Sequence, residues 1–536
     1  MNPWAKFMAI TDYAHNEFSI WERGLTQFRV VIYYLGLIFY PHPSRLNFDY
    51  DFTLSHSLIN PITTLLSLVS IIGLLGLSYY LAKRERLLSF CILWFLGNLV
   101  IESSIIPLAI IFEHRTYLPS MLVVFMTVIL IFRYLKHTGV RVTVLCAVVL
   151  IFSFWTYDRN NVWSNPVSLW EDNVAKSPNK ARPYYNLGLA LMSQDKIDEA
   201  IEHYTISLKL NPNRSSTHNN LGLALEEQGK TEEAIEHYKE AIRIRPDNWR
   251  ANCNLGLALV AQGQTIEAIG YFEKALHIKP DNEESHYNLG YALMKQGRTD
   301  DAIKYYAEAL CIKPDYAEAH SSMGMALAKT GRLDEAIRHY LKAISLNPEL
   351  VEAHNNLGVA LSNTGRLDEA IKHFNEALRM KPDHLEAHNN LGAALSRQGH
   401  LDEAMSHLNE VLKIQPDHAE AHNNLGIALS RKEKFDEAIT HFNDALRIKP
   451  DYAEAHNNLG IVLSYKGRLE EAVEHLKMAL QIKPDYAQAH NNMGIVLTYQ
   501  GGLEEAIIHF TEALRIEPDY AEARNNLQSV SRLKDK

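Results

Sequence analysis

Long apolar runs dominate the first third of the chain. Residues 62–82 form a run of 21 residues without a charged side chain. That length is enough to cross a hydrocarbon layer of about 30 Å at about 1.5 Å per helical residue. Further candidates are the runs at 87–112, 118–134 and 140–157, with a shorter one at 25–40. The pattern predicts a transmembrane domain of four or five helices over residues 25–157, preceded by a polar segment, 1–24.

Two basic loops predict the orientation of these helices. The loops at 83–86 and 133–141 are rich in Lys and Arg, and they fall on the same side if 87–112 crosses the membrane once. Basic loops favour the cytoplasmic side. We therefore expect the loop at 41–56, the turn around His114 and everything after residue 157 to face the periplasm or a lumen.

Beyond the apolar runs the pattern changes to a strict period of 34 residues. Proline recurs at this period from Pro178 to Pro518, and glycine and alanine recur with it. A period of 34 with this pattern indicates tetratricopeptide repeats, in which each unit is a pair of helices that buries its apolar face only by stacking on its neighbours. The predicted fold is all-α, a partial multi-pass membrane domain followed by an α-α superhelical solenoid.

The period also sets the domain boundaries. We place ten repeats at 181–520, a capping helix at 521–536 and a connector at 158–180. Within a repeat, Asp451 and Glu454 have the spacing of a helix-capping box. Glycine ends the first helix of most repeats, and Asp195 and Glu433 replace it at a cost of about 1 kcal/mol.

Asparagine recurs at one position of the first helix. If Ala181 is position 1, position 6 is asparagine in nine of ten repeats, with Ser322 as the exception. The apolar positions 3, 7, 10 and 11 lie on a different helix face. A side-chain amide both donates and accepts hydrogen bonds. The predicted peptide-binding residues are Asn186, Asn220, Asn254, Asn288, Asn356, Asn390, Asn424, Asn458 and Asn492. The alternative is that these amides bond between adjacent repeats.

Histidine recurs at positions 4 and 23 of the repeats. Equivalent residues of stacked helices lie about 8–10 Å apart, whereas metal ligands approach a shared ion to about 2 Å. This spacing argues against a metal array. We interpret the histidines as a repeat consensus, with a pH-dependent surface charge as the alternative.

Composition restricts the partners. The net charge is −10, and the acidic excess lies in the repeats, which argues against nucleic acid as a partner because phosphate binding needs an excess of Lys and Arg. The four cysteines are scattered and show neither a disulfide framework nor metal-site spacing.

Two parts of the chain, the repeats and the membrane part, resemble known families. The asparagines resemble those that line the concave face of O-linked N-acetylglucosamine transferase repeats. The stretches "FYPHPSRLNFDYDF", "EHRTYLPS" and "NNVWSNPVSLWEDN", followed by repeats, resemble the later membrane half of the protein O-mannosyltransferase-like (GT-C type) family that carries tetratricopeptide repeats. That resemblance implies a polyprenyl-phosphate sugar donor and transfer to Ser or Thr outside the cytoplasm. The family's catalytic acid lies in an earlier loop, so we expect the catalytic half to be missing.

The membrane part contains further candidate residues. Glu113, His114 and Arg115 are the candidate site for a donor-lipid phosphate, with the polar end of a helix as the alternative. Glu102 is a candidate intramembrane polar site. Asp49 and Asp51 have a D-x-D spacing and are a weak metal candidate. We assign no catalytic residue, no cofactor and no other metal.

Two functions from different classes follow. In the first, the chain is a membrane-anchored scaffold whose groove binds polypeptide clients on the extracytoplasmic side and supports protein glycosylation. In the second, it is a protein O-glycosyltransferase, or half of one that a separately encoded part completes. We expect that the chain alone is not an enzyme, and that membrane lipid, in the second case a polyprenyl-phosphate sugar, is its other partner.

Overall fold

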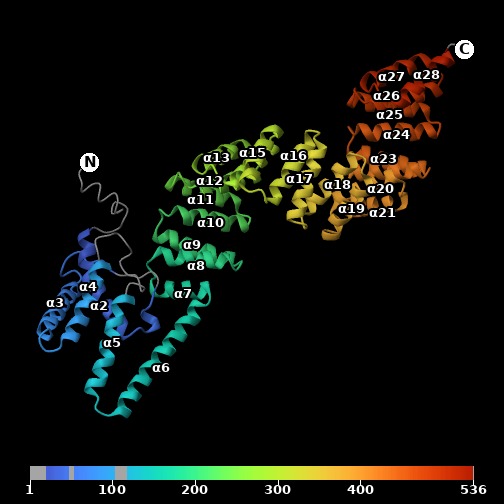
Figure 1. Ribbon diagram of the computed structural model, residues 1–536. Helices are drawn as coiled ribbons and strands as arrows, with labels where there is room; N and C mark the ends of the chain where they lie inside the picture. Colours follow the sequence, from blue (N-terminus) through green and yellow to red (C-terminus); the bar gives the residue numbers. More distant parts are fainter. Residues whose placement is uncertain (1–19, 48–52, 103–116, 535–536) are drawn as a thin grey trace. The chain divides into compact units, whose positions relative to one another are not determined.

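The computed structural model describes residues 20–47, 53–102 and 117–534, and these residues are helical without a β-strand. The all-α prediction is therefore confirmed for the described part of the chain. The chain forms two compact units, Met1–Gln264 and Thr265–Lys536. The helices of each unit can be followed in Figure 1.

The apolar first third forms five helices. Their bounds are α2 (Ile20–Phe39), α3 (Thr63–Leu81), α4 (Arg86–Glu102), α5 (Tyr117–Tyr134) and α6 (Thr138–Trp163), with a short 3-10 turn, η2 (Pro43–Arg45), after α2. Two of these helices, α3 and α6, are long and apolar enough to cross a membrane, while the apolar parts of α2, α4 and α5 are shorter. A multi-pass membrane domain is thus not established by the helix lengths.

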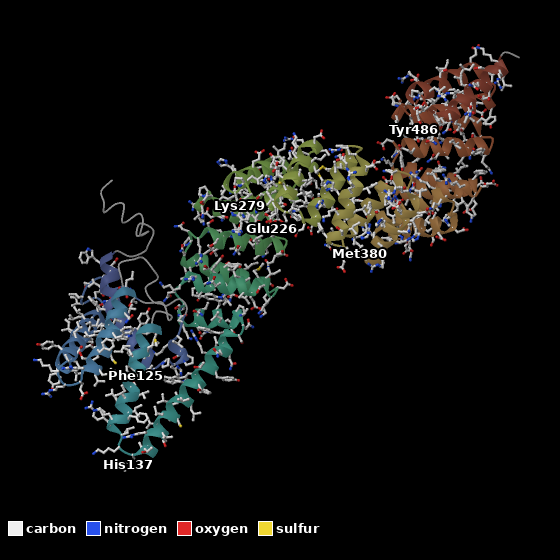
Figure 2. All side chains as sticks on the ribbon, in the orientation of Figure 1. Phe125, His137, Glu226, Lys279, Met380 and Tyr486 are labelled. Carbon is white, nitrogen blue, oxygen red and sulfur yellow. The ribbon has the colours of Figure 1, made fainter. Side chains whose placement is uncertain are left out.

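Helices α2, α4 and α5 share a small apolar core. Val30, Tyr34, Phe95 and Val123 are buried in it. By contrast, α6 exposes large apolar side chains along its length, and Leu150 is 70% exposed. Exposed apolar surface of this extent is characteristic of an interaction face rather than of a monomer surface in water. Figure 2 marks Phe125, an exposed residue of α5, and His137, in the loop between α5 and α6.

An ion pair joins the two basic loops. Arg133, in the last turn of α5, lies 2.6 Å from Glu85, which stands directly before α4. The hydrogen bond to Arg133 lowers the pKa of the Glu85 carboxyl. The loops after α3 and α5 therefore meet at the same end of the helix bundle, as expected if both lie on one side of a membrane.

A polar junction connects this bundle to the repeats. The connector 158–180 contains the end of α6 and the helix α7 (Pro166–Lys176). The Nζ of Lys176 donates to the carbonyl oxygens of Pro43 (2.8 Å) and Leu46 (2.9 Å) and lies 2.6 Å from Asp172. Buried Arg159 donates to the same Leu46 oxygen at 2.9 Å. Because α7 in turn packs on α8, the loop after α2 is fastened to the base of the repeat array.

The repeats are regular helix pairs. Their first helices are α8 (Ala181–Met192), α10 (Ser215–Glu227), α12 (Trp249–Ala261), α14 (Glu283–Lys295), α16 (Ala317–Lys329), α18 (Val351–Asn363), α20 (Leu385–Gln398), α22 (Ala419–Arg431), α24 (Ala453–Tyr465) and α26 (Ala487–Tyr499). Their second helices are α9 (Ile197–Leu210), α11 (Thr231–Ile244), α13 (Thr265–Ile278), α15 (Thr299–Ile312), α17 (Leu333–Leu346), α19 (Leu367–Met380), α21 (Leu401–Ile414), α23 (Phe435–Ile448), α25 (Leu469–Ile482) and α27 (Leu503–Ile516). A last helix, α28 (Ala521–Lys534), packs on α27.

A glycine allows the two helices of a repeat to pack closely. Position 8 is glycine, and a Cβ atom added to Gly426 would lie 2.7 Å from the ring of Phe442 on the second helix. Position 24 carries the buried ring or leucine that fills this space, and Phe442 is 1% exposed. The periodic glycine is therefore required by packing and not only by backbone conformation.

The turn between paired helices needs a left-handed residue. Gly467 has φ +74° there, and Asp195 (φ 61°) and Glu433 (φ 59°) adopt the same conformation without being glycine. The predicted capping box is wrong in detail. Helix α24 begins at Ala453 with Tyr452 as its N-cap and has no side-chain cap bond, because Asp451 lies one residue too early in the turn.

Candidate functional site

The asparagine ladder, defined as the nine predicted position-6 residues, lies at the seam between successive first helices. Its members are half-buried, apart from Asn288 and Asn492, which are buried. In several repeats the side-chain Nδ2 donates to the position-5 side chain of the preceding repeat, as Asn424 does to Asn389 at 3.0 Å and Asn458 to Asn423 at 3.0 Å. The ladder thus bonds between repeats, which is the alternative that the sequence left open.

This bonding leaves part of each amide available. Asn458 uses one of its two N–H groups on Asn423, and its Oδ1 accepts from Asn457 at 3.3 Å. An amide carries a second N–H group and a second lone pair. At Asn458 the inter-repeat bond therefore fixes the orientation of the amide while a donor and an acceptor remain for a ligand, so the two interpretations of the ladder are compatible.

A polar groove opens beside the ladder in the first unit. Its volume is about 1080 Å³, and its lining includes Asn219 and Asn220 together with the side chains of Arg214, Arg245 and Arg250. Arg214 lies over the ring of Tyr185 at 4.4 Å, and Arg245 lies 2.9 Å from Asp247. Only Asn220 of the predicted ladder belongs to this lining.

Sequence reasoning missed the basic character of this groove. The repeats are acidic overall, and position 2 is glutamate in the repeats from Glu284 to Glu454. The first and third repeats carry Arg182 and Arg250 there instead. The signal was available in the sequence, since the charge at position 2 changes sign along the array.

Histidines at positions 4 and 23 of the same repeat form pairs. In seven repeats their Nδ1 atoms lie 2.9–3.1 Å apart, for example His320 and His339 at 3.0 Å. Nε2 of His320 lies 3.1 Å from the carbonyl oxygen of Pro314. Because a carbonyl only accepts, this Nε2 carries the proton, and Nδ1 of His320 accepts the Nδ1–H of His339 when both rings are neutral.

Burial disfavours protonation of such pairs. Burial lowers the pKa of His218 and of His237, and the neighbouring His218 ring lowers that of His237 further. The sequence argument compared equivalent positions of neighbouring repeats and so did not foresee that two different positions of one repeat would meet.

The candidates of the membrane part fall mainly outside the described residues. Asp49, Asp51, Glu113, His114 and Arg115 all lie there. Glu102 is the last residue of α4, but the described part of the chain does not include its side chain. Among α2, α3, α4 and α5 there is an apolar cavity of about 260 Å³ lined by residues such as Leu77, Cys91 and Met126. The proposed roles of the acidic and basic candidate residues of the membrane part remain predictions.

Family comparisons support the repeats. The profile of the cilia and flagella-associated protein 70 C-terminal domain matches residues 316–530. Tetratricopeptide-repeat profiles match residues 181–214, 225–263 and 259–325. The chain therefore carries tetratricopeptide repeats and has the architecture of a scaffold that mediates protein interactions.

Sequence relatives are similar over short stretches. A stretch of 79 residues is 33% identical to the protein O-mannosyl-transferase TMTC1 of Homo sapiens and covers 14% of this chain and 9% of that protein. The mouse counterpart is 37% identical over 62 residues, which is 12% of this chain and 7% of that protein. The matches thus span less than a tenth of either relative's length.

Several solved structures are similar to this chain. YrrB, a repeat protein described with an unusual peptide-binding site, is 27% identical, covers 35% of this chain and 96% of its own, and has a TM-score of 0.30. The APC/C hetero-tetramer Cut9-Hcn1 is 15% identical, covers 86% and 98%, and has a TM-score of 0.44. At these TM-scores the likenesses carry no inference about function.

Proposed function

We propose that this protein is a membrane-anchored scaffold that binds extended polypeptide segments in the groove of its repeats on the extracytoplasmic side. The observation that carries the proposal is the asparagine ladder. Several of its amides are oriented by inter-repeat bonds, as Asn424 is by Asn389, and an amide so held keeps a donor and an acceptor for a peptide backbone. Backbone recognition of this kind accepts many sequences.

The basic end of the groove adds selectivity. Arg214, Arg245 and Arg250 line it, within a repeat array that is otherwise acidic. Complementary charge raises association rates and selects partners. We therefore expect client segments with acidic side chains to bind across the first three repeats.

The anchoring part of the proposal rests on the apolar helices. Helices α3 and α6 are long and apolar enough to span a membrane, and the exposed apolar surface of α6 needs a cover such as lipid. The basic loops joined by Arg133 and Glu85 would lie on the cytoplasmic side. The repeats follow α6 and so begin on the opposite side.

The test is peptide binding to the full-length chain in detergent. An array of unstructured peptides of unrelated sequence identifies an acidic binder, and fluorescence anisotropy then measures its Kd. The double variant Asn220→Ala and Asn254→Ala should weaken binding about tenfold, because two oriented amides lost at roughly 0.5–1.5 kcal/mol each give that factor. Asn443→Ala, at an exposed position of α23, is the matched control, and equal binding by all three proteins would refute the proposal.

The likeness to protein O-mannosyl-transferase TMTC1 favours a second candidate, a protein O-glycosyltransferase or half of one. The apolar cavity among α2 to α5 would then hold part of a polyprenyl chain. Incubating the chain in vesicles with a polyprenyl-phosphate mannose and a Ser/Thr-containing peptide distinguishes the two. Sugar transfer would favour the second function, and peptide binding without transfer would favour the scaffold.

A further inference from the structure

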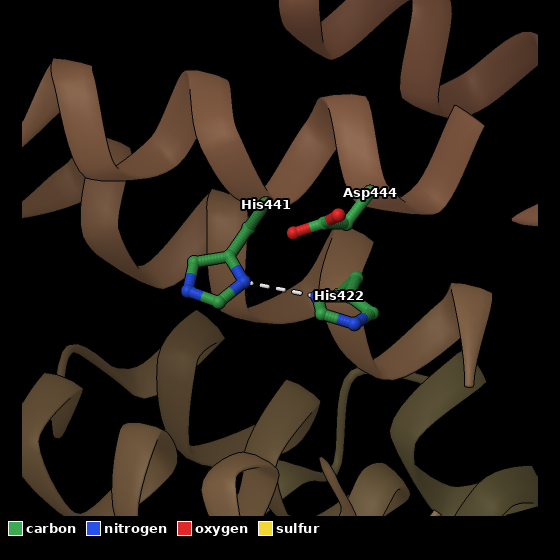
Figure 3. A group of neighbouring side chains, drawn as sticks. All are labelled: His422, His441 and Asp444. Atoms are coloured by element: carbon green, nitrogen blue, oxygen red, sulfur yellow. Dashed lines mark hydrogen bonds between the residues drawn. The ribbon is translucent and has the colours of Figure 1, made fainter. Parts of the chain in front are cut away.

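In one of the histidine pairs, the two rings and a neighbouring carboxylate bring their ligand atoms close together. His422 lies on α22, and His441 and Asp444 lie on α23, one helical turn apart. The side chains of all three face one another in Figure 3, and their ligand atoms lie within 4.8 Å of one another. The two Nδ1 atoms are already 2.9 Å apart. Neighbouring ligands of a tetrahedral zinc ion lie about 3.3 Å apart, given bonds of about 2.0–2.2 Å.

From this arrangement we propose that His422, His441 and Asp444 form a binding site for a divalent transition-metal ion of the zinc class. Two imidazoles and a carboxylate are a donor set that zinc accepts, with water in the fourth position. The site links the two helices of one repeat and is independent of the peptide groove.

The surroundings of His422 orient it as a ligand. Its Nε2 donates to the carbonyl oxygen of Pro416 at 3.0 Å, which leaves the lone pair on Nδ1. Metal-bound histidines commonly donate their other N–H to a backbone carbonyl in this way. His441 donates its Nδ1–H to Nδ1 of His422. To bind the metal through Nδ1, His441 adopts the other neutral tautomer, in which the proton is on Nε2. His422 is 8% exposed, whereas His441 and Asp444 are half-buried, so solvent still reaches the site.

Among the carboxylates at this position of the repeats with a histidine pair, Asp444 has the longest ion-pair distance to a neighbouring cation. Five repeats with a histidine pair have a carboxylate at position 26, namely Glu240, Glu376, Glu410, Asp444 and Glu512. Arginine holds three of these glutamates at 2.6–2.8 Å, and Lys413 lies 3.3 Å from Glu410. The nearest Arg447 nitrogen lies 3.5 Å from Asp444, and this arginine is shared with Asp417. A metal ion therefore competes with a weaker ion pair at Asp444.

The next repeat is a natural control. His456 and His475 form the same pair with Nδ1 atoms 3.0 Å apart, but Met478 stands where the acidic residue would be. If three ligands are needed, this repeat should not bind the ion tightly. Installing the missing carboxylate with Met478→Asp should create a second site.

The experiment is a zinc titration of the full-length chain in detergent, in competition with a chromophoric zinc indicator. We expect one tightly bound equivalent, at least tenfold weaker binding in Asp444→Asn and in His441→Ala, and a second equivalent in Met478→Asp. His475→Ala should bind as the parent does. A zinc-dependent rise in Tm, lost in Asp444→Asn but kept in His475→Ala, reports the same site without the indicator.

Two results would overturn the proposal. One is a parent chain without tight zinc binding. The other is zinc binding that either Asp444→Asn or His441→Ala leaves unchanged. Circular dichroism of each variant shows whether its helices are intact, and Asp444→Asn, which keeps the shape of the side chain, tests the site even if His441→Ala does not fold.

Discussion

At the scale of single residues, the repeats depend on buried and half-buried polar side chains that form hydrogen bonds with one another. Asn424 and Asn389 bond across a repeat boundary, and His320 and His339 bond within a repeat. A buried polar group without a partner would cost about 1–3 kcal/mol. Each consensus polar position therefore comes with a consensus partner, and the pair is the unit that the sequence repeats.

The histidine pairs make the stability of the array depend on pH. Burial is the main cause that lowers the pKa of His320, Lys342 lowers it further, and the hydrogen bond to the Pro314 carbonyl opposes this. Burial also lowers the pKa of His339, and the neighbouring His320 ring, Arg338 and Arg332 lower it further, while Glu335 opposes this. The unfolded chain therefore binds protons first as the pH falls below the ordinary histidine value of about 6.5.

We expect the urea midpoint of unfolding to be constant above this pH and to fall below it. Replacing both His320 and His339 by glutamine should reduce the difference between midpoints measured at about pH 7.5 and about pH 5.5. A midpoint that rises on acidification would contradict the lowered pKa values, as would histidine NMR titrations with ordinary midpoints.

At the scale of helices, glycine has two different roles. In α22, Gly426 allows contact with Phe442, and an added Cβ would lie 2.7 Å from its ring. In α13, Gly270 has no atom within 4 Å of the same added Cβ. The first glycine is a packing requirement, whereas the second only lowers the helix propensity of α13 at a site with room for a side chain.

The same substitution should thus have opposite effects at these two sites. Gly426→Ala should destabilise the array by about 1–3 kcal/mol through overpacking. Gly270→Ala should stabilise it by up to about 1 kcal/mol through helix propensity. Urea unfolding monitored by circular dichroism measures both. Equal changes at the two sites would show that the close contact with Phe442 has no energetic weight.

At the scale of the whole molecule, an apolar helix bundle leads into an acidic repeat array through a polar junction. Lys176 binds the loop after α2 at Pro43 and Leu46, and α7 packs on the first repeat. The junction fixes where the array starts relative to α6. The orientation of the helices in the membrane would therefore also determine on which side of the membrane the peptide groove lies.

Cysteine labelling tests this sidedness. Cys311 is exposed on α15, so in a chain whose other three cysteines are replaced by serine it should react with a membrane-impermeant maleimide added outside intact cells. In a cysteine-free chain, a thiol introduced by Lys136→Cys, in the basic loop after α5, should react only after the membrane is opened. The reverse pattern would place the repeats in the cytoplasm.

The sequence by itself determined the repeats and their helices, because stacking each helix pair imposes the same demands every 34 residues. It also predicted the apolar helices, since length and hydropathy are local properties. Only the tertiary structure decided which side chains meet. Positions 4 and 23 lie on different helices, and positions 5 and 6 pair across a repeat boundary. Such contacts depend on helix packing, which the 34-residue period requires but does not specify atom by atom. The histidine pairs and the three-residue candidate metal site were therefore invisible until the helices were placed.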